Sequence, residues 1–223
     1  MTDSFRPSVL RAKAWETLRD KWGQAALTSL VIYVAYIVVL VLSALVPILG
    51  LVVVLLAFSV LIIGYQFIFL DVYRGKPLDG KTVLEPLQNY GRYLGGFLLM
   101  CVYVFLWSLL LYIPGIIKML SYSMTFYIMR DNPEMSGEQA IQRSMEMMKG
   151  HKMELFLLSL SFIGWILLSI ITLGIGYLWI YPYMFTAQVA FYEELKKDYE
   201  NTQPFSVSSF GNGENTVVIT TEA

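Results

Sequence analysis

The sequence predicts an all-α polytopic membrane protein, with six transmembrane helices arranged as three hairpins and with cytoplasmic interfacial helices. Its composition is the first reason: 57% of the 223 residues are hydrophobic and only 15% are charged, whereas a soluble domain carries about 25% charged residues. Charge placement is the second reason. Three segments, 22–70, 93–129 and 155–192, contain a single charged residue among them, Lys118. Because about 18 consecutive apolar residues already indicate a membrane span, no soluble core explains these segments.

Each apolar segment is long enough for two spans, since a hydrocarbon core of about 30 Å takes roughly 20 helical residues. The first segment breaks near Pro47, which predicts spans over 24–45 and 50–70. The third breaks at 172–176, around Gly174 and Gly176, which predicts spans over 154–171 and 177–195. Proline and glycine are the residues expected where the chain reverses direction.

The middle segment is open to two interpretations. A break around Pro114 gives a span over 93–111 and a shorter one over 116–129, which contains Lys118 and several hydroxyl side chains. The alternative is one long helix kinked at Pro114.

Basic residues favour the hairpin, because they mark the cytoplasmic side of a span. Fifteen of the 16 Lys and Arg residues lie in the four segments 1–21, 71–92, 130–154 and 196–197. Only six spans place all four segments on one side. We therefore expect a multi-pass membrane protein with both termini in the cytoplasm, and we expect Lys118 to reach the outer headgroups.

The polar segments predict helices at the membrane surface. Residues 8–22 carry apolar side chains at spacings of three and four, with basic residues elsewhere, which is typical of a helix lying flat in the interface. Residues 136–149 predict a second such helix, with Ser136 as its N-cap. The loop 75–92 contains two prolines, so only a short, broken helix is expected there.

These assignments divide the chain into three parts. Residues 1–23 form the cytoplasmic amphipathic N-terminal helix, and residues 24–195 form the membrane domain. Residues 196–223 form a polar cytoplasmic tail, and their composition predicts disorder.

An internal repeat is also suggested. Each predicted hairpin follows a polar stretch that ends in glycine, at Gly23, Gly91 and Gly150, and such a glycine would end the interfacial helix. The sequence therefore suggests three copies of an interfacial helix followed by a hairpin. Chance similarity among apolar sequences is the alternative.

Reactive residues are few, which argues against an enzyme. Cys101 is the only cysteine and His151 the only histidine, so the sequence offers no intrachain disulfide, no cysteine metal site and no multi-histidine site. The apolar neighbours of Cys101 predict a buried, inert thiol. No catalytic motif is found, and the loop acids Asp131, Glu134, Glu146 and Glu154 are expected to be solvated. We expect no enzymatic activity, no cofactor and no metal.

Binding candidates fall into two groups. Four residues are candidates for contact with anionic lipid headgroups, although a plain cytoplasmic anchor is the favoured reading of them: Arg143, Lys149, His151 and Lys152. Three polar positions lie within predicted spans: Gln66, Lys118 and Gln188. The expected partners are membrane lipids, with other membrane proteins or a second copy of the chain as further candidates. The net charge of −1 gives no reason to expect nucleic acid.

Several motifs, concentrated after Tyr122, carry a family resemblance. They are SMEMMKGHK at 144–152, SFIGW at 161–165, LGIG at 173–176 and the stretch from Pro182-Tyr183 to Phe191-Tyr192. Together they resemble a bacterial membrane family catalogued as domain of unknown function number 975, over most of residues 15–195. The resemblance implies a plasma-membrane protein, typical of Gram-positive bacteria, and supplies no catalytic residues. A looser likeness is to the membrane portion of some glycerophosphodiester phosphodiesterases, whose catalytic barrel has no counterpart in this sequence.

Two functions are consistent with these observations. The first is a non-enzymatic membrane scaffold or accessory protein that contacts lipids or partner proteins. The second is a small permease or channel for a lipid-like or uncharged solute. A cavity that reaches Gln66, Lys118 or Gln188 would favour the second function.

Overall fold

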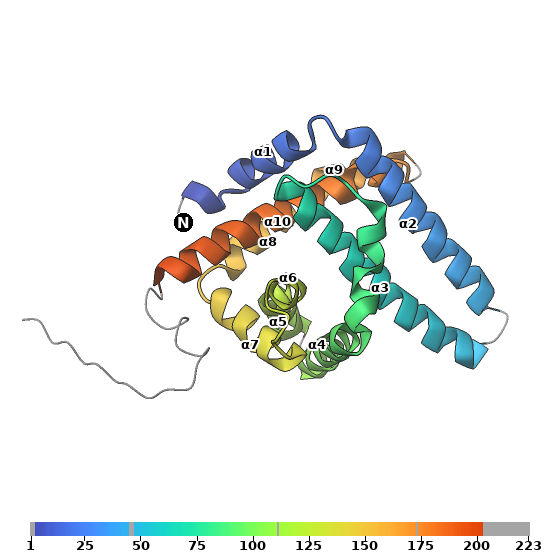
Figure 1. The fold of residues 1–223 in the computed structure, drawn as a ribbon. Coiled ribbons are helices and arrows are strands. Elements are labelled where there is room, and N and C mark those ends of the chain that lie inside the picture. The colour runs from blue at the N-terminus through green and yellow to red at the C-terminus, as the bar shows by residue number, and fades with distance from the viewer. Residues whose placement is uncertain (1–2, 45–46, 111, 173, 203–223) are drawn as a thin grey trace, which may run out of the picture.

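The computed structural model describes residues 3–44, 47–110, 112–172 and 174–202, and every regular element in them is a helix (Figure 1). The predicted all-α class is confirmed. In chain order the elements are η1 (Asp3–Phe5), α1 (Pro7–Leu18), α2 (Trp22–Ser43), α3 (Pro47–Tyr73), η2 (Gly80–Asn89), α4 (Tyr90–Leu110), α5 (Tyr112–Tyr122), α6 (Thr125–Asp131), α7 (Gly137–Met147), α8 (Lys152–Leu160), α9 (Ile163–Ile171) and α10 (Tyr177–Thr202).

Four helical stretches are long and apolar enough to cross a membrane: Trp22–Ser43, Val52–Tyr73, Gly80–Leu109 and Lys152–Ile171. The other two predicted spans take a different form. The span expected over 116–129 consists of the short helices α5 and α6. The segment expected to form the last span, 177–195, is part of α10, which continues through Thr202. The segment expected to be a disordered tail therefore begins as helix, and its residues 203–223 lie outside the described part of the chain.

The chain reverses direction near each predicted turn. α2 ends at Ser43 and α3 begins at Pro47, because the fixed φ of proline suits the first helical position. α9 ends at Ile171, and the turn that follows it places Gly174 at φ +89°. α5 packs back against α4, so Pro114 lies in the first turn of α5 and not at a kink in one long helix.

The three hairpins share a packing contact that supports the internal repeat. In each hairpin, a serine near the end of the first helix is followed seven residues later by a glycine that touches it. The pairs are Ser43 with Gly50, Ser108 with Gly115, and Ser169 with Gly176. A Cβ atom on Gly176 would lie 2.9 Å from Ser169 Oγ, and the other two glycines are packed more tightly still. Glycine is therefore needed at each turn for the close approach of the two helices.

Helix α5 stops before α6 begins, and a serine from α7 bonds the backbone at the break. Ser144 Oγ accepts a hydrogen bond from the Met124 N–H at 3.3 Å and donates one to the Ser121 carbonyl at 2.8 Å. Both groups are freed because the helix is interrupted there. The break is thus stabilised by a residue of the neighbouring helix α7, since a buried backbone group without a partner is costly.

Helix α1 supports the second break in the same way. The backbone is interrupted at residues 161–162, between α8 and α9, and Arg11 Nη1 donates to the Ser161 carbonyl at 3.3 Å. α1 lies along α10 (Figure 1) and buries Leu10, Ala14 and Leu18. The predicted apolar face of this helix is therefore confirmed for these three residues, while Trp15 is 51% exposed.

The other two polar segments also form the expected elements. Ser136 caps α7 through a reciprocal pair of hydrogen bonds with Gln139, which confirms the predicted N-cap. The loop 75–92 contains the 3₁₀ helix η2, in which residues three apart share one face. Lys81, Leu84 and Leu87 therefore form an exposed stripe; the two leucines are 54% and 51% exposed.

Two of the three predicted terminator glycines are wrong. Gly150 adopts φ +88° after α7, as expected. Gly23 and Gly91 instead lie in the first turns of α2 and α4. The reason is that residues 19–21 form the turn before α2 without glycine, and η2 passes directly into α4 at Tyr90.

The core lies at one end of the hairpins. α2 buries only Ala25, Ala26 and Ser29, all near its start, whereas the last part of α3, residues 59–72, is largely buried. The opposite halves of these helices present exposed leucine, valine and isoleucine side chains. Cys101 is exposed as well, so the predicted burial of its thiol is wrong, because few helices pack around that part of α4. An exposed apolar surface of this extent is typical of contact with lipid.

Candidate functional site: an ion-pair cluster and a cavity

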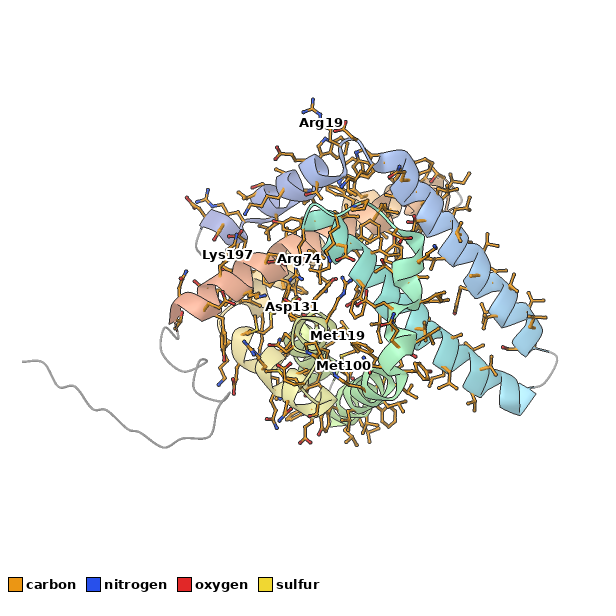
Figure 2. The ribbon with its side chains drawn as sticks, viewed as in Figure 1. Arg19, Arg74, Met100, Met119, Asp131 and Lys197 are labelled. Atoms are coloured by element: carbon orange, nitrogen blue, oxygen red, sulfur yellow. The ribbon has the colours of Figure 1, made fainter. Side chains whose placement is uncertain are left out.

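Charged side chains from four elements meet at the buried end of the hairpins. This ion-pair cluster comprises Asp71, Arg74, Glu85, Arg130, Asp131, Glu193 and Lys196. Asp71 lies in the last turn of α3, and Arg74 directly follows that helix. α6 contributes its last two residues, Arg130 and Asp131. α10 contributes Glu193 and Lys196, and η2 contributes the remaining acid. Figure 2 shows Arg74 and Asp131 near the centre of the molecule. The cluster therefore joins the returning helices of all three hairpins.

Asp131 is the acid with the most partners. Arg74 donates to both of its carboxylate oxygens, at 2.8 and 2.7 Å, Lys196 Nζ donates at 2.9 Å and the Tyr192 hydroxyl at 3.0 Å. Burial opposes ionisation of this carboxyl, but the hydrogen bonds and the attraction of the two cations outweigh it and lower its pKa to about 2. Asp131 is therefore ionised at neutral pH, and it links α6 to α3 and α10.

Arg130 has a similar role between α6, α3 and η2. Its guanidinium donates to Asp71 Oδ2 at 2.8 Å, to the two Glu85 carboxylate oxygens at 3.0 and 2.6 Å, and to the Phe67 carbonyl at 2.8 Å. It also lies 4.6 Å from the centre of the Phe67 ring. Burial alone would lower the pKa of Arg130, but the two carboxylates raise it. A planar, bidentate arginine suits this many contacts better than lysine would.

A third arginine holds the end of α6. Arg92 of α4 donates to the carbonyls of Met135, at 2.7 Å, of Asn132, at 3.0 Å, and of Met129. These carbonyls lie at or just beyond the C-terminus of α6, where backbone acceptors lack helical partners and a cation is favoured. The short helix α6 is thus held by three sets of contacts, those of Asp131, Arg130 and Arg92.

The cluster acts as a clamp that holds α3, η2, α6 and α10 together. Each of its charged side chains is paired with one of opposite sign. Among the described residues, no group of three or more His, Cys, Asp and Glu side chains is placed to hold a metal ion. The expectation that Asp131 is solvated is wrong, because Arg74, Tyr192 and Lys196 surround its carboxylate and leave the side chain only 11% exposed.

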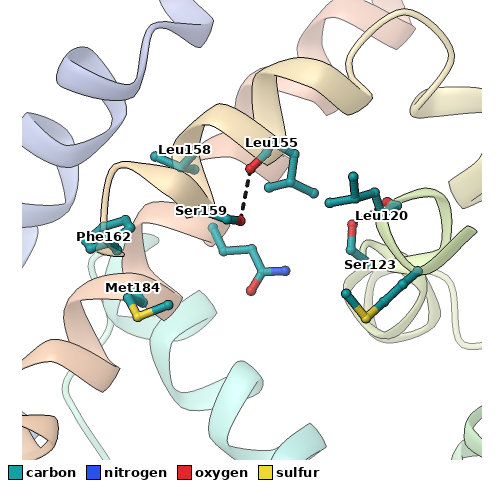
Figure 3. A pocket seen from close by; sticks show the side chains of 9 residues that line it. Leu120, Ser123, Leu155, Leu158, Ser159, Phe162 and Met184 are labelled. Atoms are coloured by element: carbon teal, nitrogen blue, oxygen red, sulfur yellow. Dashed lines mark hydrogen bonds between the residues drawn. The ribbon is translucent and has the colours of Figure 1, made fainter. Parts of the chain in front are cut away.

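A cavity of about 270 Å³ lies between α5, α8 and α10 (Figure 3). Its lining consists of Met119, Leu120, Ser123, Leu155, Leu158, Ser159, Phe162, Met184 and Gln188. In Figure 3, Leu155, Leu158 and Ser159 of α8 lie across from Leu120 and Ser123. Ser123 and Phe162 occupy the two helix breaks. The cavity reaches Gln188, one of the three polar positions predicted within the spans.

Comparison with known proteins gives one match. The family model described as a protein of unknown function, DUF975, matches residues 38–199, which is well over half of the chain. The chain belongs to the DUF975 family. The comparisons with curated proteins and with solved structures gave no match. The DUF975 match covers the cluster, the cavity and the three hairpin turns, whereas α1 lies before it.

The basic residues predicted to contact lipid have different surroundings in this DUF975 chain. Among the described residues, the side chains of Lys149 and Lys152 make no hydrogen bond or salt bridge. Arg143 instead lies 5.7 Å from the Tyr199 ring centre and close to Asn132. Lys149 and Lys152 are therefore the two cations left free to bind lipid headgroups. The lipid contact itself remains a prediction.

His151 is engaged on both sides of its ring. Its Nδ1 lies 2.7 Å from Glu154 Oε2, its Nε2 lies 3.3 Å from Asp198 Oδ2, and its ring packs against Phe5 with centres 4.6 Å apart. The side chain joins α8, α10 and η1. Glu154 is buried, so the expectation that it is solvated is also wrong.

The other two predicted polar positions lie apart from the cavity lining. Gln66 is buried in α3, and its Oε1 has no hydrogen-bond partner among the described residues. Lys118 is half-buried, with its Nζ 4.7 Å from the centre of the Trp107 ring. A cation on an aromatic face near a hairpin turn is consistent with the predicted anchor at the headgroups.

Proposed function

We propose that the chain crosses the bacterial plasma membrane six times, with both termini in the cytoplasm, and acts as a non-enzymatic scaffold or accessory protein. The ion-pair cluster is the observation that supports the six-span topology. Salt bridges of about 3 Å join the ends of three predicted spans, at residues 71–74, 130–131 and 193–196. Helix ends on opposite sides of a bilayer would be separated by about 30 Å. The contacts therefore support a common side for all three ends, as six spans require.

The charge pairing and the exposed surface of the chain support the scaffold role. The charged side chains of the cluster are all paired with one another, and the exposed surface of the hairpins is apolar. The polar elements add contacts suited to the interface: the stripe of Lys81, Leu84 and Leu87, the exposed Trp15, and the unpaired lysines beside α8. These features suit binding of lipids and of other membrane proteins.

Single-cysteine labelling tests the topology. In a Cys101→Ser background, Glu134→Cys places a thiol in the exposed α6–α7 loop, and Ile175→Cys places one in the α9–α10 turn. We expect a membrane-impermeant maleimide to label intact cells at position 175 only, and to label position 134 after the cells are opened. Labelling of position 134 in intact cells would contradict six spans.

Lipid retention tests the scaffold's contact with the membrane. We expect Lys149→Gln/Lys152→Gln to reduce the anionic lipid that copurifies with the gently extracted protein, measured by mass spectrometry. The control Arg6→Gln/Lys197→Gln removes the same charge from side chains that already form salt bridges with Asp3 and Glu194. Equal retention in the wild type and the Lys149/Lys152 variant would exclude the predicted headgroup contact.

The cavity favours a second function, movement of a lipid-like or uncharged solute across the bilayer. Interrupted helices that line a cavity are typical of membrane transporters, and here two interruptions reach the same cavity. Flux of a fluorescent monoacylglycerol between the leaflets of reconstituted vesicles tests it. A rate equal to that of protein-free vesicles would exclude this function for that solute.

A further inference from the structure

We propose that the cavity between α5, α8 and α10 binds a neutral, single-chain amphiphile with a hydroxyl-bearing head, taken up from the hydrocarbon phase. As a transported substrate, this ligand class rests on the second function proposed above, whereas binding does not depend on transport. The inference comes from the size of the cavity, its polar groups and the surroundings of its opening.

The size of the cavity suits a ligand of moderate bulk. Its volume is about 270 Å³, nearly twice that of the engineered cavity of roughly 150 Å³ that binds benzene. Small-molecule pockets begin at about 300 Å³. The cavity therefore holds a small head and the first carbons of a chain, and the remaining carbons must extend out of it.

The polar groups of the lining suit a neutral hydroxyl. Gln188 makes no hydrogen bond to any described residue, so its amide can donate and accept. The hydroxyls of Ser123 and Ser159 donate to the Leu120 and Leu155 carbonyls, at 2.8 and 3.0 Å, which leaves their oxygen lone pairs as acceptors. A ligand hydroxyl can donate to a serine oxygen and accept from the Gln188 amide.

The same lining disfavours an ionised head. None of the nine lining residues is charged, so a phosphate or carboxylate would lose its hydration without gaining a counter-ion, which is strongly unfavourable. Lys149 and Lys152, which do not line the cavity, are better suited to bind anionic headgroups. The two sites therefore discriminate between lipids by charge.

Part of the cavity lining is exposed apolar surface. Met119 of α5 lines the cavity and is 55% exposed. A chain leaving the cavity here enters the hydrocarbon phase and not water. Methionine suits such an entrance because its side chain adapts to ligands of varied shape.

Photocrosslinking of the full chain in lipid nanodiscs tests the site. The probe is a monoacylglycerol with a diazirine in the first carbons of its chain. We expect its crosslinks to map to residues 119–123, 155–162 and 184–188, and we expect unlabelled monooleoylglycerol to compete at least tenfold better than oleoyl lysophosphatidic acid. Crosslinks spread evenly over the exposed hairpin halves, or equal competition by the anionic lipid, would overturn the proposal.

Two variants and a matched control separate binding from folding. Gln188→Leu should weaken competition by monooleoylglycerol about five- to tenfold, as expected for loss of a neutral hydrogen bond. Ser159→Ala, a milder change, should weaken it by a smaller factor. Gln66→Leu makes the same substitution in α3, outside the cavity lining, and should leave competition unchanged. Wild-type competition in a folded Gln188→Leu protein would overturn the assignment of the head-binding residue.

Flux measurements on the same variants distinguish this proposal from the transport function. Specific crosslinking in a protein that moves no monoacylglycerol would support the binding site and exclude the transport function. Flux that persists in Gln188→Leu without cavity crosslinks would support the transport function and exclude this binding site.

Discussion

Replacing Asp131 by asparagine is the sharpest perturbation of the ion-pair cluster. The side chain keeps its shape and can still accept hydrogen bonds, but Arg74 and Lys196 lose the charge that balances them. Removing one partner of a buried ion pair costs about 3–5 kcal/mol. Asp131 is only 11% exposed, whereas Arg74 and Lys196 are 30% and 35% exposed. Since water can reach both cations, we expect the lower limit, about 3 kcal/mol.

The assay is thermal unfolding of the purified protein in detergent, followed by far-ultraviolet circular dichroism. For a chain of this size, about 3 kcal/mol corresponds to a fall of roughly 6–12 °C in the midpoint. Glu134→Gln is the matched control, since it is the same type of change at an exposed position three residues away, and it should shift the midpoint by less than about 2 °C. Equal midpoints for Asp131→Asn and Glu134→Gln would refute the clamp.

Three further outcomes are expected. The lowered pKa of Asp131 means that its contribution is complete above about pH 4 and is lost as the pH falls towards 2; thermal scans should show a loss of about 2 kcal/mol over that interval that Asp131→Asn lacks. Gly176→Ala should reduce the yield of folded protein, because its Cβ would overlap Ser169, while Gly164→Ala, with open space around it, should not; equal yields in size-exclusion chromatography would contradict this. Ser136→Ala should lower stability by about 1 kcal/mol through loss of the α7 cap, and a midpoint unchanged from the wild type would argue against the cap.

The hairpins could be predicted from the sequence because their signals are local. The length of an apolar segment predicts a helix, and a proline or glycine predicts where it ends. The turns near Pro47, Pro114 and Gly174 therefore lie close to their expected positions. The Ser136 cap depends on residues three apart and was predictable for the same reason. The shared serine–glycine spacing of the turns was also visible in the sequence, but its meaning emerges only when both helices are placed side by side.

The cluster and the helix breaks depend on contacts between distant segments. Arg74, Asp131 and Lys196 each follow an apolar segment of the sequence, and a charge in that position is expected to be solvated until the three segments are brought together. The break after α5 depends on Ser144, twenty residues further along the chain, and the break after α8 depends on Arg11 at the other end of it. No local pattern specifies such partners. One signal was available: each of the three apolar segments is followed by an acid and a base that lie one or three residues apart.

A double-mutant cycle between Arg74 and Asp131 tests most directly the central claim that the three hairpins are joined by one ion-pair cluster. The two residues are 57 positions apart in sequence, and their side chains lie 2.7 Å apart. Thermal unfolding of Arg74→Gln, Asp131→Asn and the double variant should give an interaction energy of about 1 kcal/mol or more. Additive effects, with an interaction energy below roughly 0.3 kcal/mol, would show that these helix ends do not meet.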